Sequence, residues 1–112
     1  MTELKIKATI KKIRTDAQSG NIRITRHALQ EMAEESIGLD EVLESIAVGK
    51  VLEYYPKHRR GSCCLLYGKT RLGKPLHIVC TTDLPVLIVI TTYRPQLPKW
   101  ISPTERRKKD GM

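Results

Sequence analysis

The chain has 112 residues and a formal net charge of +8, and 40% of its residues are apolar. This length suits one modest core, and this apolar fraction is typical of a folded protein rather than a disordered one. No apolar run approaches the roughly 20 residues of a membrane-spanning helix, and no secretory signal is recognisable. We therefore expect a cytoplasmic protein without membrane contact.

The charge is distributed unevenly along the chain. Residues 31–53 contain seven acids and one base, whereas the remainder contains 19 bases and five acids. The segment from Tyr54 to Thr82 has six bases and no acid. A field of one sign over part of a small domain concentrates polyanions, so this pattern favours RNA as a partner.

Three helices are predicted before residue 50. An apolar stripe at helical spacing predicts a first helix that ends at Ser19-Gly20. Thr25 is expected to cap a second helix that ends near Ser36, because its hydroxyl can accept from first-turn amides. A third helix is expected from about Asp40 to Gly49. The first stripe consists of Ile6, Ile10, Ile13 and Ala17.

Four strands are predicted after Gly49, joined by links too short for parallel crossovers. They are Val51–Tyr55, Ser62–Tyr67, Pro75–Thr82 and Val86–Tyr93. The sequence thus predicts an α+β fold with N-terminal helices packed on one face of a four-stranded antiparallel sheet. We expect residues 1–100 to form one domain and residues 101–112 to form a flexible basic tail.

Two histidines and a tyrosine are the candidate catalytic residues. His27 lies in the first turn of the second helix, where the helix N-terminus favours a neutral ring that can accept a proton. Glu31, one turn later, could orient that ring. The alternative for His27 is a structural histidine that bonds to backbone.

His77 is placed in the middle of a strand, on the face opposite Leu76 and Ile78. On an open face it would be available for chemistry, and under helices it would be a satisfied core residue. Period-2 alternation places Tyr93 on the face of Leu87, Val89 and Thr91.

Five cations are candidate phosphate ligands. No acid is near the connection between the second and third strands in sequence, and Arg94 is expected to be free at the sheet edge. These candidates are Lys69, Arg71, Lys74, Arg94 and Arg60.

Together these residue types suit RNA cleavage, in which a 2′-hydroxyl attacks the adjacent phosphate to give a cyclic phosphate. A base removes the hydroxyl proton, an acid protonates the leaving oxygen and cations stabilise the developing charge. The three cysteines include an adjacent pair and no CxxC, and no cluster of ligands has metal-binding spacing. We therefore expect no metal and no cofactor.

Several short blocks, in order over residues 24 to 100, resemble a bacterial and archaeal family of domains of unknown function, DUF4258. The blocks are Ile24-Thr25-Arg26-His27-Ala28, Val51-Leu52-Glu53-Tyr54-Tyr55-Pro56, Leu65-Leu66-Tyr67-Gly68, Gly73-Lys74-Pro75-Leu76-His77-Ile78-Val79 and Thr91-Thr92-Tyr93-Arg94-Pro95 with Trp100. His27, His77 and Tyr93 match the most characteristic polar positions of the family.

The family is grouped by fold with the RelE-like toxins, which are small ribosome-dependent or free endoribonucleases. The resemblance therefore implies a RelE-like, small microbial RNase-like fold, metal-free RNA cleavage, including of ribosome-bound mRNA, and an antitoxin as protein partner. Glu31 and Glu35 depart from the family pattern, which has arginines there. Two alternatives stay open, namely a non-catalytic RNA-binding module and a protein-interaction domain that uses the acidic helix pair. The oligomeric state also stays open.

Overall fold

The computed structural model describes residues 2–97 and 99–107. Three helices precede the main strands, as predicted, and Thr25 caps the second helix by accepting from the amide of Ala28 at 3.1 Å. Within the described residues no helix is long and apolar enough to cross a membrane. The elements are α1 (Glu3–Gln18), β1 (Ile22–Ile24), α2 (Arg26–Glu35), α3 (Leu39–Val48), β2 (Lys50–Tyr55), β3 (Cys63–Lys69), β4 (Pro75–Thr81), β5 (Leu87–Tyr93), β6 (Trp100–Ser102) and β7 (Glu105–Arg106).

The main sheet has five strands in the order β1-β5-β4-β3-β2. The strands β2 to β5 pair antiparallel, as predicted, but β1 pairs parallel to β5, with Ile22 opposite Leu87. The prediction of a four-stranded antiparallel sheet is therefore corrected to a mixed sheet of five strands. Three residues are too few to show an alternating pattern in the sequence, so only the pairing with β5 identifies β1 as a strand.

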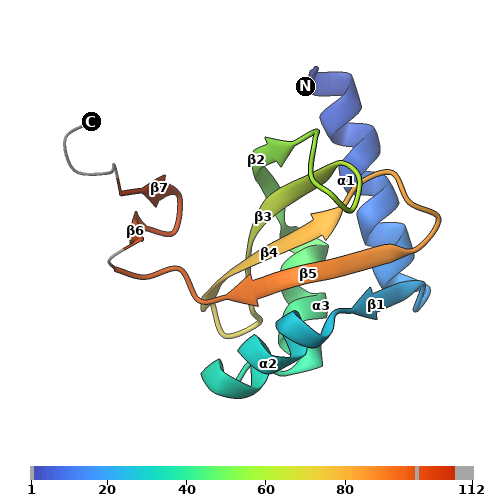
Figure 1. Ribbon diagram of the computed structural model, residues 1–112. Helices are drawn as coiled ribbons and strands as arrows, with labels where there is room; N and C mark the ends of the chain where they lie inside the picture. The colour runs from blue at the N-terminus through green and yellow to red at the C-terminus, as the bar shows by residue number, and fades with distance from the viewer. Residues whose placement is uncertain (1, 98, 108–112) are drawn as a thin grey trace.

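The core lies between the sheet and the helices. The alternate residues Leu76, Ile78 and Cys80 of β4 are fully buried against α1 and α3, which contribute Ile13 and Ile46. In Figure 1, α1 and α3 lie on one side of the sheet, whereas β6 and β7 lie on the other. The opposite face of β4, which contains His77, therefore faces away from these helices.

Residues 101–107, the first part of the expected tail, form most of the β6–β7 hairpin. Trp100 is 2% exposed, and the Arg106 guanidinium lies 4.6 Å from the centroid of its ring. Arg106 also donates to both carboxylate oxygens of Glu53 on β2. These contacts hold the hairpin against the sheet. The remainder of the expected tail, residues 108–112, lies outside the described residues.

Candidate functional site

A pocket of about 400 Å³ opens on the face of the sheet that points away from α1 and α3. Five separate segments of the chain meet there. The lining residues are His27 and Glu31 from α2, Tyr55 from β2, Val79 from β4, Thr91 and Tyr93 from β5, and Lys99 and Arg106 from the C-terminal segment. The pocket thus combines a histidine, a carboxylate, two phenols and two cations.

His27 and Glu31 form an ordered pair at the wall of this pocket. Nε2 of His27 lies 3.3 Å from Oε1 of Glu31, and the histidine side chain is 69% exposed. Glu31 is itself fixed by β5, because it accepts from the amide of Thr92 at 3.1 Å and from the Thr91 hydroxyl. With Nε2 directed to the carboxylate, Nδ1 of His27 is the ring nitrogen that can accept a proton from a ligand.

His77 is fully buried and both of its ring nitrogens are occupied. Nε2 lies 2.6 Å from the carbonyl oxygen of Pro103, which can only accept, so this nitrogen has the hydrogen. Nδ1 then accepts from the hydroxyl of Tyr93 at 3.1 Å, and that hydroxyl accepts from Nε1 of Trp100 at 3.1 Å. The result is a chain of hydrogen bonds from Trp100 through Tyr93 and His77 to the hairpin backbone.

This environment also determines the protonation of the ring. Burial lowers the pKa of His77, an effect opposed by the bond to Pro103 and by the charge of Glu53. Burial raises the pKa of Tyr93, and the hydrogen bond from Trp100 opposes that rise. His77 is therefore neutral and Tyr93 is protonated at neutral pH, as the chain of hydrogen bonds requires.

The position of His77 matches neither sequence alternative completely. The residue lies on the face away from α1 and α3, but the C-terminal hairpin covers it there. The ring centroids of His77 and Trp100 are 4.4 Å apart in an edge-to-face arrangement. His77 is thus a satisfied buried histidine, although the covering element is a hairpin and not a helix.

Tyr93 lies on a different face from the one that strand alternation predicted. Val79 pairs with Thr91, but Cys80 pairs with Val89, so β5 contains one additional residue at this point. Such a bulge reverses the faces of all residues beyond it. Leu87 and Val89 therefore point into the core, whereas Thr91 and Tyr93 line the pocket on the opposite face.

The structure brings two of the three candidate catalytic residues to the pocket. His27 and Tyr93 line it, and His77 lies in contact with Tyr93 beneath the hairpin. The Tyr93 hydroxyl already has a donor and an acceptor partner, so His27 is the candidate whose reactive nitrogen is open to a ligand.

The five candidate phosphate ligands are separated from this pocket. Lys69, Arg71 and Lys74 lie at or next to the β3–β4 turn, where Arg71 contacts Glu44 of α3 at 3.8 Å. Glu44 thus approaches this turn in space, although no acid is near the turn in sequence. Arg60 lies near the opposite end of the seven-residue β3, about 20 Å away at roughly 3.3 Å per residue.

Arg94 is not free at the sheet edge. Its Nη2 lies 3.4 Å from a carboxylate oxygen of Glu41 and 3.2 Å from the carbonyl oxygen of Ser36. The expectation of a mobile Arg94 is therefore wrong. Strand alternation explains its position, because Arg94 follows Tyr93 and points to the helix side of the sheet.

Sequence reasoning missed the two cations that do line the pocket, Lys99 and Arg106. Arg106 belongs to the segment that the sequence predicts as a tail, where a run of bases normally indicates solvated side chains. The only signal for its position was the indole of Trp100, which an arginine can cover by stacking.

The three cysteines are buried and free. Within residues 2–97 and 99–107, no group of three or more histidine, cysteine and acidic side chains has an arrangement that could hold a metal ion.

Comparison with known proteins identifies a family but no individual related protein. No curated protein and no solved structure matches the chain. A family model described as "Domain of unknown function (DUF4258)" matches residues 24–94. This match extends from β1 through β5 and covers His27, His77 and Tyr93, which is more than half of the chain. The chain therefore belongs to the DUF4258 family.

Proposed function

We propose that the chain is a cytoplasmic, metal-independent endoribonuclease of the RelE-like toxin type, and that the pocket lined by His27, Tyr93 and Arg106 is its cleavage site. The observation that supports this proposal most directly is the meeting of the His27–Glu31 pair with Lys99 and Arg106 around one pocket. The order of helices before the antiparallel strands β2 to β5 is consistent with the RelE-like grouping that the sequence resemblance implies.

In the proposed reaction, Nδ1 of His27 removes the proton of a ribose 2′-hydroxyl. The hydroxyl oxygen attacks the adjacent phosphorus, the bond to the 5′-oxygen breaks and a 2′,3′-cyclic phosphate forms. Glu31 orients the imidazole and stabilises it once it is charged, and Lys99 and Arg106 stabilise the phosphate. The imidazolium or a water molecule returns a proton to the leaving oxygen.

In this proposal His77 and Tyr93 act as positioning residues. Their hydrogen bonds reach Trp100 and Pro103, which fix the segment that carries Lys99 and Arg106. RNA, including ribosome-bound mRNA, is the proposed substrate. An antitoxin that covers the pocket is the proposed protein partner.

A non-catalytic RNA-binding module is the second candidate. It is favoured by the fact that His77 and the Tyr93 hydroxyl are occupied by partners within the protein, which leaves His27 as the histidine open to a ligand at the pocket. A protein-interaction role for the acidic helices has less support. Glu31 and Glu35 bind β5, and Glu41 and Glu44 bind arginines of the same chain.

The test is cleavage of a labelled RNA oligonucleotide by the purified protein in the presence of a chelator. The expected products end in a 2′,3′-cyclic phosphate, and an all-deoxy oligonucleotide should not be cleaved. His27→Ala should reduce the rate about 10²- to 10⁴-fold, the usual contribution of a general base. His58→Ala is the matched control, because His58 lies in the β2–β3 loop and not at the pocket.

A second variant separates binding from chemistry. Lys99→Ala should weaken RNA binding and reduce its salt dependence by about one counterion, whereas Lys57→Ala should not. RNA binding by the wild-type protein without cleavage would support the non-catalytic module. If the protein neither binds nor cleaves RNA, and bacteria that express it grow normally, both RNA functions are excluded.

A further inference from the structure

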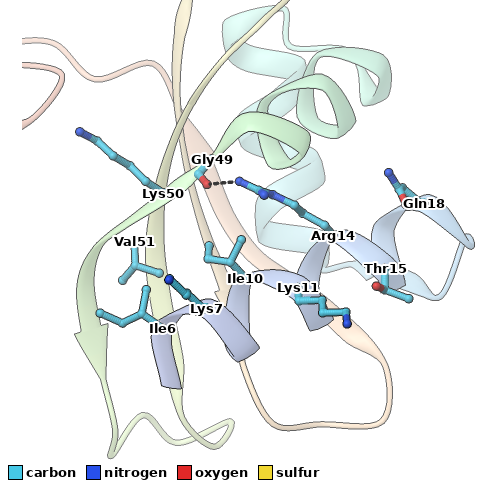
Figure 2. Close-up of a pocket in the computed structure, with 10 residues that line it drawn as sticks. All are labelled: Ile6, Lys7, Ile10, Lys11, Arg14, Thr15, Gln18, Gly49, Lys50 and Val51. Atoms are coloured by element: carbon cyan, nitrogen blue, oxygen red, sulfur yellow. Dashed lines mark hydrogen bonds between the residues drawn. The ribbon is translucent and has the colours of Figure 1, made fainter. Parts of the chain in front are cut away.

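A second and larger hollow, of about 530 Å³, lies between α1 and the start of β2 (Figure 2). One stripe of α1 forms one wall, and Gly49 with the first two residues of β2 forms the other. The lining residues are Ile6, Lys7, Ile10, Lys11, Arg14, Thr15 and Gln18 from α1 and Gly49, Lys50 and Val51 from the second wall. We call this hollow the α1–β2 groove.

The α1–β2 groove has an aliphatic floor and a basic rim. Ile6, Ile10 and Val51 are half-buried and converge between the helix and the strand in Figure 2. Lys7, Lys11 and Lys50 are exposed around them. Among the described residues that line the groove there is no acid and no aromatic ring. The lysine charges therefore have no counterion within the groove itself.

The two walls are tied together, so the groove exists before any partner binds. Arg14 extends from α1 and donates from Nη2 to the carbonyl oxygen of Gly49 at 3.0 Å, as the dashed line in Figure 2 shows. Nε of the same guanidinium is buried without a hydrogen-bond partner in the described part of the chain. Preformed walls reduce the ordering cost of binding.

We propose that the α1–β2 groove binds an acidic segment of a partner protein, with aliphatic side chains on the floor and carboxylates at the lysine rim. Such a segment satisfies both features of the groove. Single-stranded RNA would satisfy only the charge, because its bases bind by stacking on aromatic rings, and none lines this groove. A polypeptide with mixed acidic and aliphatic side chains is therefore the better match.

This surface is separate from the proposed cleavage site. The α1–β2 groove shares no lining residue with the pocket that contains His27, and α1 packs on the opposite side of the sheet from the C-terminal hairpin. A partner in the groove would leave that pocket accessible. The inference does not depend on RNA cleavage and can be tested separately.

The test is selection of binders from a phage-displayed library of random short peptides on the full-length protein. The expected result is enrichment of sequences that combine aspartate or glutamate with leucine, isoleucine or valine. A synthetic, fluorescein-labelled copy of the most enriched peptide is then titrated with variants. Lys7→Glu together with Lys11→Glu should weaken its binding at least about tenfold, because like charges then face each other.

The matched control is Lys5→Glu together with Lys57→Glu, which changes the net charge equally but does not alter the groove lining. Its affinity should stay within about twofold of wild type. Ile6→Ser tests the floor and should also weaken binding, with an unchanged melting temperature as the check on folding. Absence of enrichment, equal binding by the Lys7/Lys11 variant, displacement of the peptide by an RNA oligonucleotide, or self-association of the chain through this groove would each overturn the proposal.

Discussion

The hydroxyl of Tyr93 connects two buried ring nitrogens, Nε1 of Trp100 and Nδ1 of His77. Neither nitrogen has another hydrogen-bond partner among the described residues. The hydroxyl accepts from Nε1 of Trp100 and donates to Nδ1 of His77, each at 3.1 Å. His77 and Trp100 are 0% and 2% exposed, so water is a poor substitute for the hydroxyl. Removal of this one oxygen therefore affects both ends of the network.

We expect Tyr93→Phe to lower the free energy of unfolding by about 2–3 kcal/mol, because it leaves two buried polar atoms unsatisfied. Urea denaturation measures the change. Tyr54→Phe is the control, since Tyr54 packs on the core and no hydrogen bond of its hydroxyl occurs among the described residues. Equal stability of the two variants would contradict the network. Loss of activity in Tyr93→Phe is informative only after the fold has been checked.

The neutral state of His77 gives the fold a pH dependence. Burial places the pKa of His77 below its ordinary value of 6.5, so the unfolded chain binds the proton more readily. The contribution of neutral His77 to the free energy of unfolding is complete above about pH 6.5. It is lost as the pH falls toward the pKa of His77 in the folded state. Glu53 favours the charged ring, whereas Arg106 and Lys99 oppose it.

Unfolding free energies measured between pH 7.5 and about pH 5 should therefore fall more steeply for wild type than for His77→Gln. The glutamine variant lacks the titrating ring but retains the other two histidines as an internal reference. Parallel pH profiles would show that His77 titrates equally in the folded and unfolded chains.

At the scale of elements, α2 provides hydrogen-bond acceptors for the edge of β5 that lies beyond β1. The strand β1 pairs with β5 only as far as Val89, and the next amides on that edge lack a strand partner. Glu31 accepts from the amide of Thr92 and Glu35 from the amide of Arg94, each at 3.1 Å. Four helical residues advance about 6 Å and two strand residues about 7 Å, so carboxylates four residues apart on α2 fit alternate amides of β5.

Glu31→Ala should cost about 1–3 kcal/mol of unfolding free energy, because the buried Thr92 amide then has no acceptor. Glu31→Gln should lose less, since its amide oxygen can still accept. The matched control is Glu34→Ala on the exposed side of α2, with an expected change within about 0.5 kcal/mol. Hydrogen exchange provides a second reading, in which the amide of residue 92 should exchange faster in Glu31→Ala and not in Glu34→Ala.

At the scale of the whole molecule, the helix layer and the sheet are in close backbone contact at Gly68. A Cβ atom at this position would lie 2.1 Å from the carbonyl oxygen of Ser45 and 2.9 Å from its Cα. Both atoms belong to the backbone of α3, which cannot move aside as a side chain can. The glycine thus permits α3 to lie directly on β3.

Gly68→Ala should destabilise the protein by about 3 kcal/mol or more, because the layers must separate to admit one methyl group. Thermal denaturation followed by circular dichroism measures the loss. At Gly38 the nearest atom to a new Cβ is the flexible Asp40 side chain, so Gly38→Ala is the control and should cost less than about 1 kcal/mol. Similar melting temperatures for the two variants would contradict the close contact.

The sequence by itself determined the elements whose signals are local. Helix boundaries followed from caps such as Thr25 and from apolar spacing, and β2 to β5 followed from apolar runs that end at turn residues. These predictions succeed because a cap or an amphipathic stripe depends on residues within a few positions of one another. The family blocks were visible for the same reason, and the match over residues 24–94 confirms the resemblance to the DUF4258 family.

The tertiary structure alone decided how these elements meet. The strand β1 is defined by its pairing with β5, and one additional residue in β5 places Tyr93 on the opposite face of the sheet. Arg106, which the sequence predicts in a tail, stacks on Trp100. Each of these features joins residues that are distant in sequence or depends on pairing register, which composition and spacing do not encode. The pocket around His27 is therefore a product of tertiary structure, although His27, Glu31 and Tyr93 were recognisable from the sequence as chemically capable.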